Sequence, residues 1–160
     1  MEGYDIAQIC INGHVINSSS ESLPQYNKKF CGKCGEATIT KCQECGKSIK
    51  GYYHRDEGLS LAAYRKPDFC DNCGKPYPWT SDRILAAQDL AREVEGLSKE
   101  DRSILEQSID DIVKDSPNSP VAALRFKKIM VKAGKTAADM FKDILVSVAS
   151  EAAKKAIWGS

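Results

Sequence analysis

The chain has 160 residues, of which 42% are hydrophobic, and carries 23 Lys and Arg against 22 Asp and Glu. This composition suits one ordinary domain or two small ones and excludes a disordered chain. The formal net charge of +1 does not indicate a polyanion-seeking protein, and thiols deprotonated on metal would make the N-terminal half negative. With no apolar run long enough for a bilayer and no secretory pattern at its start, we expect a cytoplasmic protein without a membrane role.

Residues 1–80 hold all seven cysteines and lack a helical period. Short apolar pieces at 38–40 and 49–53 predict brief strands separated by turns. Without a secretory signal, cysteines in Cys-x-x-Cys pairs indicate metal ligands rather than disulfides, because each tight loop presents two thiolates and a following glycine frees the backbone. The unit occurs three times, as Cys31-Gly-Lys-Cys34-Gly35, Cys42-Gln-Glu-Cys45-Gly46 and Cys70-Asp-Asn-Cys73-Gly74.

Three pairs provide six ligands, whereas two closed tetrahedral zinc sites need eight, and Cys10-Ile-Asn-Gly-His14 supplies the other two. Pairing in chain order predicts two structural Zn²⁺ per chain. A cross-braced arrangement, which joins the first pair to the third and the second to the fourth, is the main alternative, and His54 as a ligand is a weaker one. The predicted ligand sets are Cys10, His14, Cys31 and Cys34, and Cys42, Cys45, Cys70 and Cys73.

After Trp79 the composition changes to one suited to helices. The first predicted helix runs from Thr80 or Ser81 to about Glu95 and stops at Gly96. A second is opened by the capping-box sequence Ser98-Lys-Glu-Asp101. The residues expected to face inward on these helices are Ile84, Leu85, Ala87, Leu90, Ala91 and Val94, and then Ile104, Leu105, Ile109, Ile112 and Val113.

A third helix is predicted from a Ser119 cap with Pro120 at its first position to about Trp158, roughly 57 Å long at about 1.5 Å per residue unless Gly134 breaks it. Its apolar face is wider than two short helices cover, so it either bends at Gly134 or meets another chain. Residues 81–115 carry ten acids and five bases, and residues 116–160 carry eight bases and three acids. We expect the acidic pair of helices to pack beside the basic one. The predicted stripe is Ala122, Phe126, Ile129, Ala133, Ala137, Met140, Phe141, Ile144, Leu145, Val148 and Ala152, widened by Val131, Ala138, Val146, Ala149, Ala153 and Ile157.

These patterns predict an α+β fold with two parts. Residues 1–80 form two small zinc ribbons of short β-hairpins and knuckles, and residues 81–160 form a region of about three helices, the last long, that serves as a bundle or an oligomerisation region. Tyr77, Pro78 and Trp79 are expected to pack the second ribbon against the helices.

Three segments resemble an uncharacterised bacterial family of double zinc-ribbon proteins with a domain of unknown function. They are Tyr4-Asp-Ile-Ala-Gln-Ile-Cys-Ile-Asn-Gly-His-Val-Ile-Asn17, Phe30-Cys-Gly-Lys-Cys-Gly35 and Cys73-Gly-Lys-Pro-Tyr-Pro-Trp-Thr80, with a similar tail around 121–128 and 149–155. The resemblance spans most of the chain and implies a zinc-ribbon fold and a bacterial origin. It implies no activity.

All eight predicted ligands come from protein, which favours structural over catalytic zinc. With no nucleophile elbow, phosphate loop or paired carboxylates, we do not expect an enzyme. We expect an interaction or adaptor protein that contacts a protein partner through its ribbons and self-associates through its long helix. The alternative is a nucleic-acid-binding zinc-ribbon protein, for which the best basic cluster is Arg125, Lys127, Lys128, Lys132 and Lys135.

Overall fold

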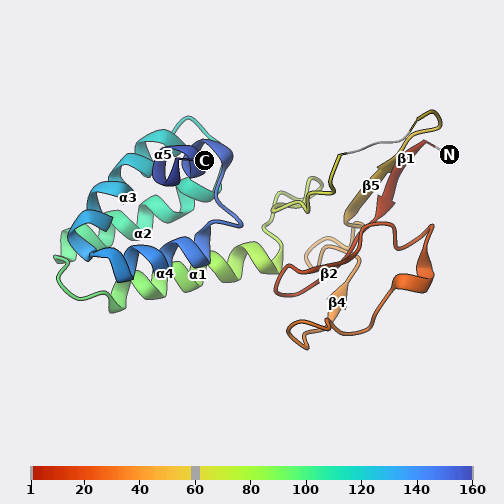
Figure 1. The fold of residues 1–160 in the computed structure, drawn as a ribbon, viewed down its shortest axis with the longest axis horizontal. Helices are drawn as coiled ribbons and strands as arrows, with labels where there is room; N and C mark the ends of the chain where they lie inside the picture. Colours follow the sequence, from red (N-terminus) through yellow and green to blue (C-terminus); the bar gives the residue numbers. More distant parts are fainter. Residues whose placement is uncertain (1, 59–61, 160) are drawn as a thin grey trace. The chain divides into compact units, whose positions relative to one another are not determined.

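A computed structural model describes residues 2–58 and 62–159. The chain divides into two compact units, residues 1–81 and 82–160, and the division falls inside helix α1 (Pro78–Glu93). Figure 1 shows short strands in the first unit and helices in the second. The α+β class predicted from the sequence is therefore confirmed.

The first unit, called the metal-binding unit below, contains two small antiparallel sheets and a short 3-10 helix (Pro24–Tyr26). One sheet pairs β1 (Gly3–Ile6) with β5 (Lys50–His54). The other has the order β3-β2-β4, from β2 (Gln8–Cys10), β3 (Val15–Asn17) and β4 (Thr38–Ile39). Strands β4 and β5 lie where the sequence predicted short strands. The pairing of β1 with β5 links the start of the chain to a strand that lies between Cys45 and Cys70 in the sequence.

Both predicted ribbons share one hydrophobic core. Ile9 of β2 and Ile49 beside β5 are fully buried, and Tyr77 and Trp79 stack in the same cluster with ring centroids 4.8 Å apart. Cys42 and Cys70 belong to this cluster as well. The metal-binding unit is therefore one interlocked body and not two independent ribbons.

Gly51 marks a close approach of backbones in this body. A Cβ there would lie 2.3 Å from the Ser18 carbonyl oxygen, 2.8 Å from Ile6 C and 2.9 Å from Ala7 N. Since three backbone atoms cannot move aside independently, we expect Gly51→Ala to destabilise the unit by about 3 kcal/mol, at the upper end of overpacking costs. Urea unfolding at fixed zinc measures the loss. Gly32→Ala, where a Cβ would meet nothing within 4 Å, is the matched control and should cost far less. Equal stability of the two variants would contradict the close approach.

The second unit, called the helical unit below, consists of most of α1 together with α2 (Lys99–Val113), α3 (Ser119–Ala133), α4 (Lys135–Leu145) and α5 (Glu151–Trp158). The predicted cap of the second helix is confirmed, because the Ser98 side chain accepts a hydrogen bond from the Asp101 N–H at 3.0 Å. Lys132 of α3 forms an ion pair with Asp101 of α2 at 3.2 Å, so an acidic and a basic helix do pack side by side.

The prediction of a single long last helix is wrong. Gly134, with φ of +92° and ψ of 167°, leaves helical geometry and separates α3 from α4. A second break follows α4, and Ser150 caps α5 by accepting a hydrogen bond from the Ala153 N–H at 3.2 Å. From Pro78 onward, the described residues therefore form five α-helices where about three helices were predicted.

The broken segments fold back on one another. Phe126 of α3 lies 5.6 Å from Phe141 of α4 and 6.5 Å from Trp158 of α5, measured between ring centroids and edge-to-face in both cases. This arrangement buries the wide apolar face that a straight rod would have left in water. Six residues assigned to inward faces are instead exposed: Leu85, Ile104, Val131, Met140, Val146 and Ala152.

Candidate metal centres

The three Cys-x-x-Cys-Gly segments adopt one backbone geometry, as expected of metal knuckles. In each, the N–H of the first cysteine donates to the carbonyl five residues on, at 2.8 to 2.9 Å, and the glycine N–H donates back to the carbonyl of the first cysteine at 2.8 to 2.9 Å. The glycine has positive φ in each case, which a side chain would strain. These glycines are Gly35, Gly46 and Gly74, with φ of +76°, +79° and +75°.

The first cluster lies at the end of β2. Cys10 is its last residue, and the turn through Gly13 brings His14 back beside it. The Cys10 Sγ lies 3.4 Å from His14 Nδ1 and 3.7 Å from Cys34 Sγ, and Cys31 Sγ lies 3.5 Å from the same Nδ1. All four ligand atoms lie within 4.8 Å of one another.

The second cluster joins the knuckles that precede β5 and α1. The Cys42 Sγ lies 3.8 Å from Cys73 Sγ, and the Cys45 Sγ lies 3.6 Å from Cys70 Sγ. The structure thus brings together the two sets that the sequence pairs in chain order, and the cross-braced alternative is wrong.

These separations can be compared with the edges of a tetrahedron around one ion. Bonds of about 2.3 Å to sulfur and 2.0–2.1 Å to nitrogen give edges of about 3.8 Å between two sulfurs and about 3.6 Å between sulfur and nitrogen. The observed 3.6 to 3.8 Å and 3.4 to 3.5 Å agree. They also exclude disulfides, whose sulfurs are about 2.05 Å apart. Each cluster can therefore hold a metal ion in a closed four-ligand site.

Backbone N–H groups of the knuckles donate to cysteine sulfurs and favour the thiolate form that binds metal. N–H groups of Cys73 and Asn72 donate to the Cys70 sulfur and lower the pKa of its thiol to about 6. Burial, by contrast, raises the pKa of the Cys10 thiol, and the His14 N–H 3.3 Å away only partly offsets it. A cation among the four ligands would favour the thiolate form throughout.

The other predicted residues lie outside both clusters. His54 is not a ligand in either, and its Nε2 lies 3.0 Å from the Asp5 carboxylate. Tyr77 and Trp79 are buried inside the metal-binding unit, where the Trp79 indole N–H donates to the Pro67 carbonyl at 3.0 Å. The basic cluster lies on the helical unit, and all five of its side chains, Arg125, Lys127, Lys128, Lys132 and Lys135, belong to exposed residues.

Asp5 is a buried polar centre that sequence reasoning missed. Its carboxylate accepts hydrogen bonds from the N–H groups of Ile6, Glu21 and Ser22 and from the Ser22 hydroxyl, and it contacts His54. Burial alone would raise the pKa of Asp5, but these donors lower it to about 2. Asp5 thereby ties β1 to the 19–22 loop and to the end of β5.

Replacing this carboxylate is expected to be costly at neutral pH. A folded pKa of about 2 against an ordinary 3.8 corresponds to about 2 kcal/mol of stability, which is present above pH 4 and lost as the pH falls towards 2. We expect Asp5→Asn to lose about 2 kcal/mol in urea unfolding at pH 7. Glu21→Gln, at an exposed neighbour, is the control, and a cost below 0.5 kcal/mol for Asp5→Asn would contradict the central role of this carboxylate.

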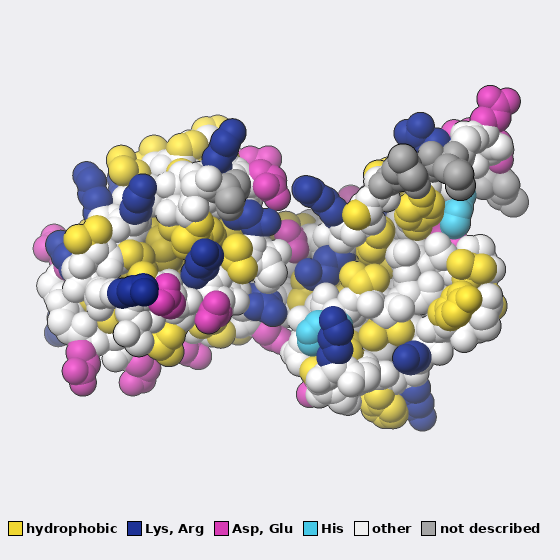
Figure 2. All heavy atoms as spheres, viewed as in Figure 1, with side chains coloured by type: hydrophobic (Ala, Val, Ile, Leu, Met, Phe, Trp, Pro, Cys, Tyr) yellow, Lys and Arg dark blue, Asp and Glu magenta, His cyan; other side chains and the backbone are white. Residues whose placement is uncertain are grey.

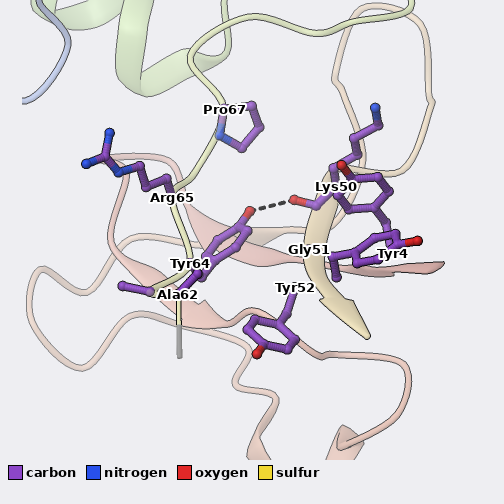
Figure 3. Close-up of a pocket in the computed structure, with 10 residues that line it drawn as sticks. Tyr4, Lys50, Gly51, Tyr52, Ala62, Tyr64, Arg65 and Pro67 are labelled. Atoms are coloured by element: carbon purple, nitrogen blue, oxygen red, sulfur yellow. Dashed lines mark hydrogen bonds between the residues drawn. The ribbon is translucent and has the colours of Figure 1, made fainter. Parts of the chain in front are cut away.

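A tyrosine-lined cavity of about 320 Å³, called the tyrosine groove below, opens beside β5 (Figure 3). Tyr4 and Tyr53 meet edge-to-face with centroids 4.8 Å apart, and the Tyr64 hydroxyl donates to the Lys50 carbonyl at 2.5 Å. Among the described residues its lining contains no carboxylate. The lining residues are Tyr4, Lys50, Gly51, Tyr52, Tyr53, Ala62, Ala63, Tyr64, Arg65 and Pro67.

A second cavity of about 220 Å³ shares Lys50 and Pro67 with the tyrosine groove and adds Phe69, Asp71 and Tyr77. The Lys50 ammonium lies 2.6 Å from the Asp71 carboxylate, so its charge is already paired. The two recesses thus share Lys50 and Pro67, both contain aromatic side chains, and the charge of Lys50 is neutralised by Asp71 of the second recess.

The model of a family described as "Uncharacterized protein conserved in bacteria (DUF2321)" matches residues 3–157. Neither the curated proteins nor the solved structures gave a match. Within the described residues, none of the helices combines the length and apolar content needed to cross a bilayer.

Proposed function

Since the chain belongs to this bacterial family of uncharacterized proteins, whose description names no activity, we propose that it is a zinc-binding, non-catalytic interaction protein. The metal-binding unit contacts a protein partner, and the helical unit mediates self-association. The observation that supports this proposal most strongly is the pair of closed four-ligand clusters. With four protein ligands each, they leave no position for water or substrate, which is typical of structural zinc.

Zinc is the proposed ion because Cys₃His and Cys₄ sets at tetrahedral separations are its usual structural sites. Native mass spectrometry of the purified chain tests the proposal. We expect two zinc ions per chain, both removed by a strong chelator. One zinc ion or none, or iron at both sites, would contradict it.

The tyrosine groove supports a protein partner rather than a phosphate-bearing one. Its apolar lining and its continuation into a second aromatic recess suit an extended peptide, as in aromatic grooves that bind proline-rich segments. The pairing of Lys50 with Asp71 leaves this cation less attractive to phosphate. We therefore propose that the partner presents an extended segment with proline or aromatic side chains.

Selection from a displayed random-peptide library against the zinc-loaded protein tests this groove. We expect enriched peptides whose binding falls at least tenfold in Tyr4→Ala. Tyr26→Ala is the matched control, because both tyrosines are 60% exposed and only Tyr4 lines the groove. Zinc content should be unchanged in both variants. Equal binding by the two variants, or no enrichment, would contradict the proposal.

Nucleic-acid binding is the second candidate, supported by four exposed cations of the basic cluster. Among the described residues, Arg125, Lys127, Lys128 and Lys135 make no ion pair, whereas Lys132 pairs with Asp101. Fluorescence anisotropy with a single-stranded oligonucleotide tests it. Binding that weakens steeply with salt and is lost in Arg125→Glu with Lys128→Glu would support nucleic acid, and no binding at low salt would contradict it.

A further inference from the structure

The solvent-facing side of α3 combines bare aliphatic side chains with cations. Val121, Leu124 and Val131 are 49%, 56% and 82% exposed, while Arg125 and Lys128 lie between them on the same face. The opposite face, which includes Phe126, Ile129 and Met130, is buried in the core. No acidic residue occurs anywhere in α3. This side of α3, called the basic face below, is thus an apolar stripe bordered by basic residues, of which Lys132 is paired with Asp101 of α2.

Helix α1 carries the complementary surface. Leu85 is 57% exposed and lies among the exposed acids Asp82, Asp89 and Glu93. We call this surface the acidic face. Among the described residues, Asp82 and Glu93 make no ion pair, and Asp89 is held only by the exposed Arg92. Figure 2 shows basic, acidic and apolar side chains mixed on the visible side of the helical unit, with further acidic ones along the lower edge.

The two faces also share one spacing. Exposed positions recur at 82, 85, 86, 89, 92 and 93 on α1 and at 121, 124, 125, 128, 131 and 132 on α3. Both series follow the threes and fours of a helix surface. Aligned in parallel, they place Leu85 opposite Leu124 and Asp89 opposite Lys128, while Glu93 comes opposite Lys132, which already pairs with Asp101 of its own chain. Apolar side chains then meet at the centre, and charges of opposite sign meet beside them.

We infer that the basic face of α3 binds the acidic face of α1 in a second copy of this chain. The inference rests on the self-association proposed above and names its two surfaces. Since the surfaces differ, each copy offers one of each, and association continues beyond a dimer unless the arrangement closes into a ring. One pair of helix faces buries less than a standard interface, so the association is weak, concentration-dependent and reduced by salt.

Complementation between two charge-reversed variants of the full-length, zinc-loaded protein tests the inference. The first variant carries Arg125→Glu and Lys128→Glu on α3, and the second carries Asp89→Lys and Glu93→Lys on α1. Each variant presents faces of like charge, so in sedimentation velocity neither should associate. An equimolar mixture should associate again, because each reversed face meets its opposite. A third variant with Lys28→Glu and Lys29→Glu, which changes net charge as the first does but in the metal-binding unit, should associate like the wild type.

The possible outcomes test the proposed self-association and its assignment to these two surfaces separately. A wild type that stays monomeric up to submillimolar concentration overturns both the self-association and this inference. A wild type that associates, with a mixture that does not recover although both variants remain folded by circular dichroism, overturns only the assignment to α1 and α3. A monomeric wild type whose α3 variant alone loses binding to anionic vesicles or to an oligonucleotide gives the basic face a different occupant and also overturns the inference.

Discussion

Replacing Cys42 with serine is expected to reduce the zinc content below two ions per chain and to unfold the metal-binding unit, while helices α2 to α5 stay folded. Serine does not supply a thiolate, and a structural zinc contributes about 10–16 kcal/mol of apparent binding free energy at neutral pH. Cys42 also lies in the shared core with Ile49 and Trp79. Because β1 pairs with β5, the damage should extend beyond the second knuckle pair to the sheet at the start of the chain.

Metal analysis together with amide hydrogen exchange measures both effects. We expect loss of protection in β1 and β5 and unchanged protection in α2 and α3. Glu44→Gln, inside the same knuckle but exposed and not a ligand, should keep two zinc ions and full protection. Two zinc ions retained in Cys42→Ser would show that this residue is not a ligand.

Trp79→Ala is expected to destabilise the metal-binding unit by about 3–5 kcal/mol, the usual cost of truncating a large buried aromatic. Trp79 is 1% exposed, stacks on Tyr77 and approaches the first cluster so closely that a Cβ on Gly13 would lie 2.8 Å from its own. Its indole also donates to the Pro67 carbonyl. One side chain therefore links the turn beside His14 to the segment before the third knuckle.

Urea unfolding of Trp79→Ala and Trp79→Phe at fixed free zinc measures the loss of stability. Trp79→Phe is the matched control, because it keeps most of the ring packing and loses mainly the hydrogen bond to Pro67, worth about 1 kcal/mol. The difference between the two variants measures the packing itself. A loss below 1 kcal/mol in Trp79→Ala would place Trp79 outside the core.

The metal clusters could be predicted from sequence because their rules are local. A Cys-x-x-Cys-Gly loop fixes its own backbone geometry, and the same holds for the Ser98 cap, whose partner is three residues away. Pairing the knuckles in chain order also gave the observed clusters. The Asp5 centre could not be predicted in this way, since its donors come from the 21–22 loop and from His54, which meet only in the folded chain.

Of the two helix breaks, one could be predicted from the local sequence and the other depends on a tertiary contact. Gly134 was visible as a breaker, and the structure uses it. The break after Leu145 contains neither glycine nor proline, and a periodic apolar pattern runs through it. There the Ser150 N–H donates to the Ile112 carbonyl at the end of α2, at 2.9 Å. This break therefore depends on a hydrogen bond to another helix. The sequence around Ser150 does not contain that partner, so it could not predict the break.

The spacing of the knuckles along the chain has a consequence for how the chain acquires its metals. Cys34 and Cys42 are only eight positions apart, yet they belong to different clusters, whereas Cys45 and Cys70 share a cluster across 25 positions. Closing the shorter loop is entropically easier by about 1 kcal/mol. The knuckle of Cys34 and the knuckle of Cys42 can therefore bind one ion between them before the native partner of either knuckle is in place. Productive folding at high metal then depends on ligand exchange, and its rate should fall as zinc is raised during refolding.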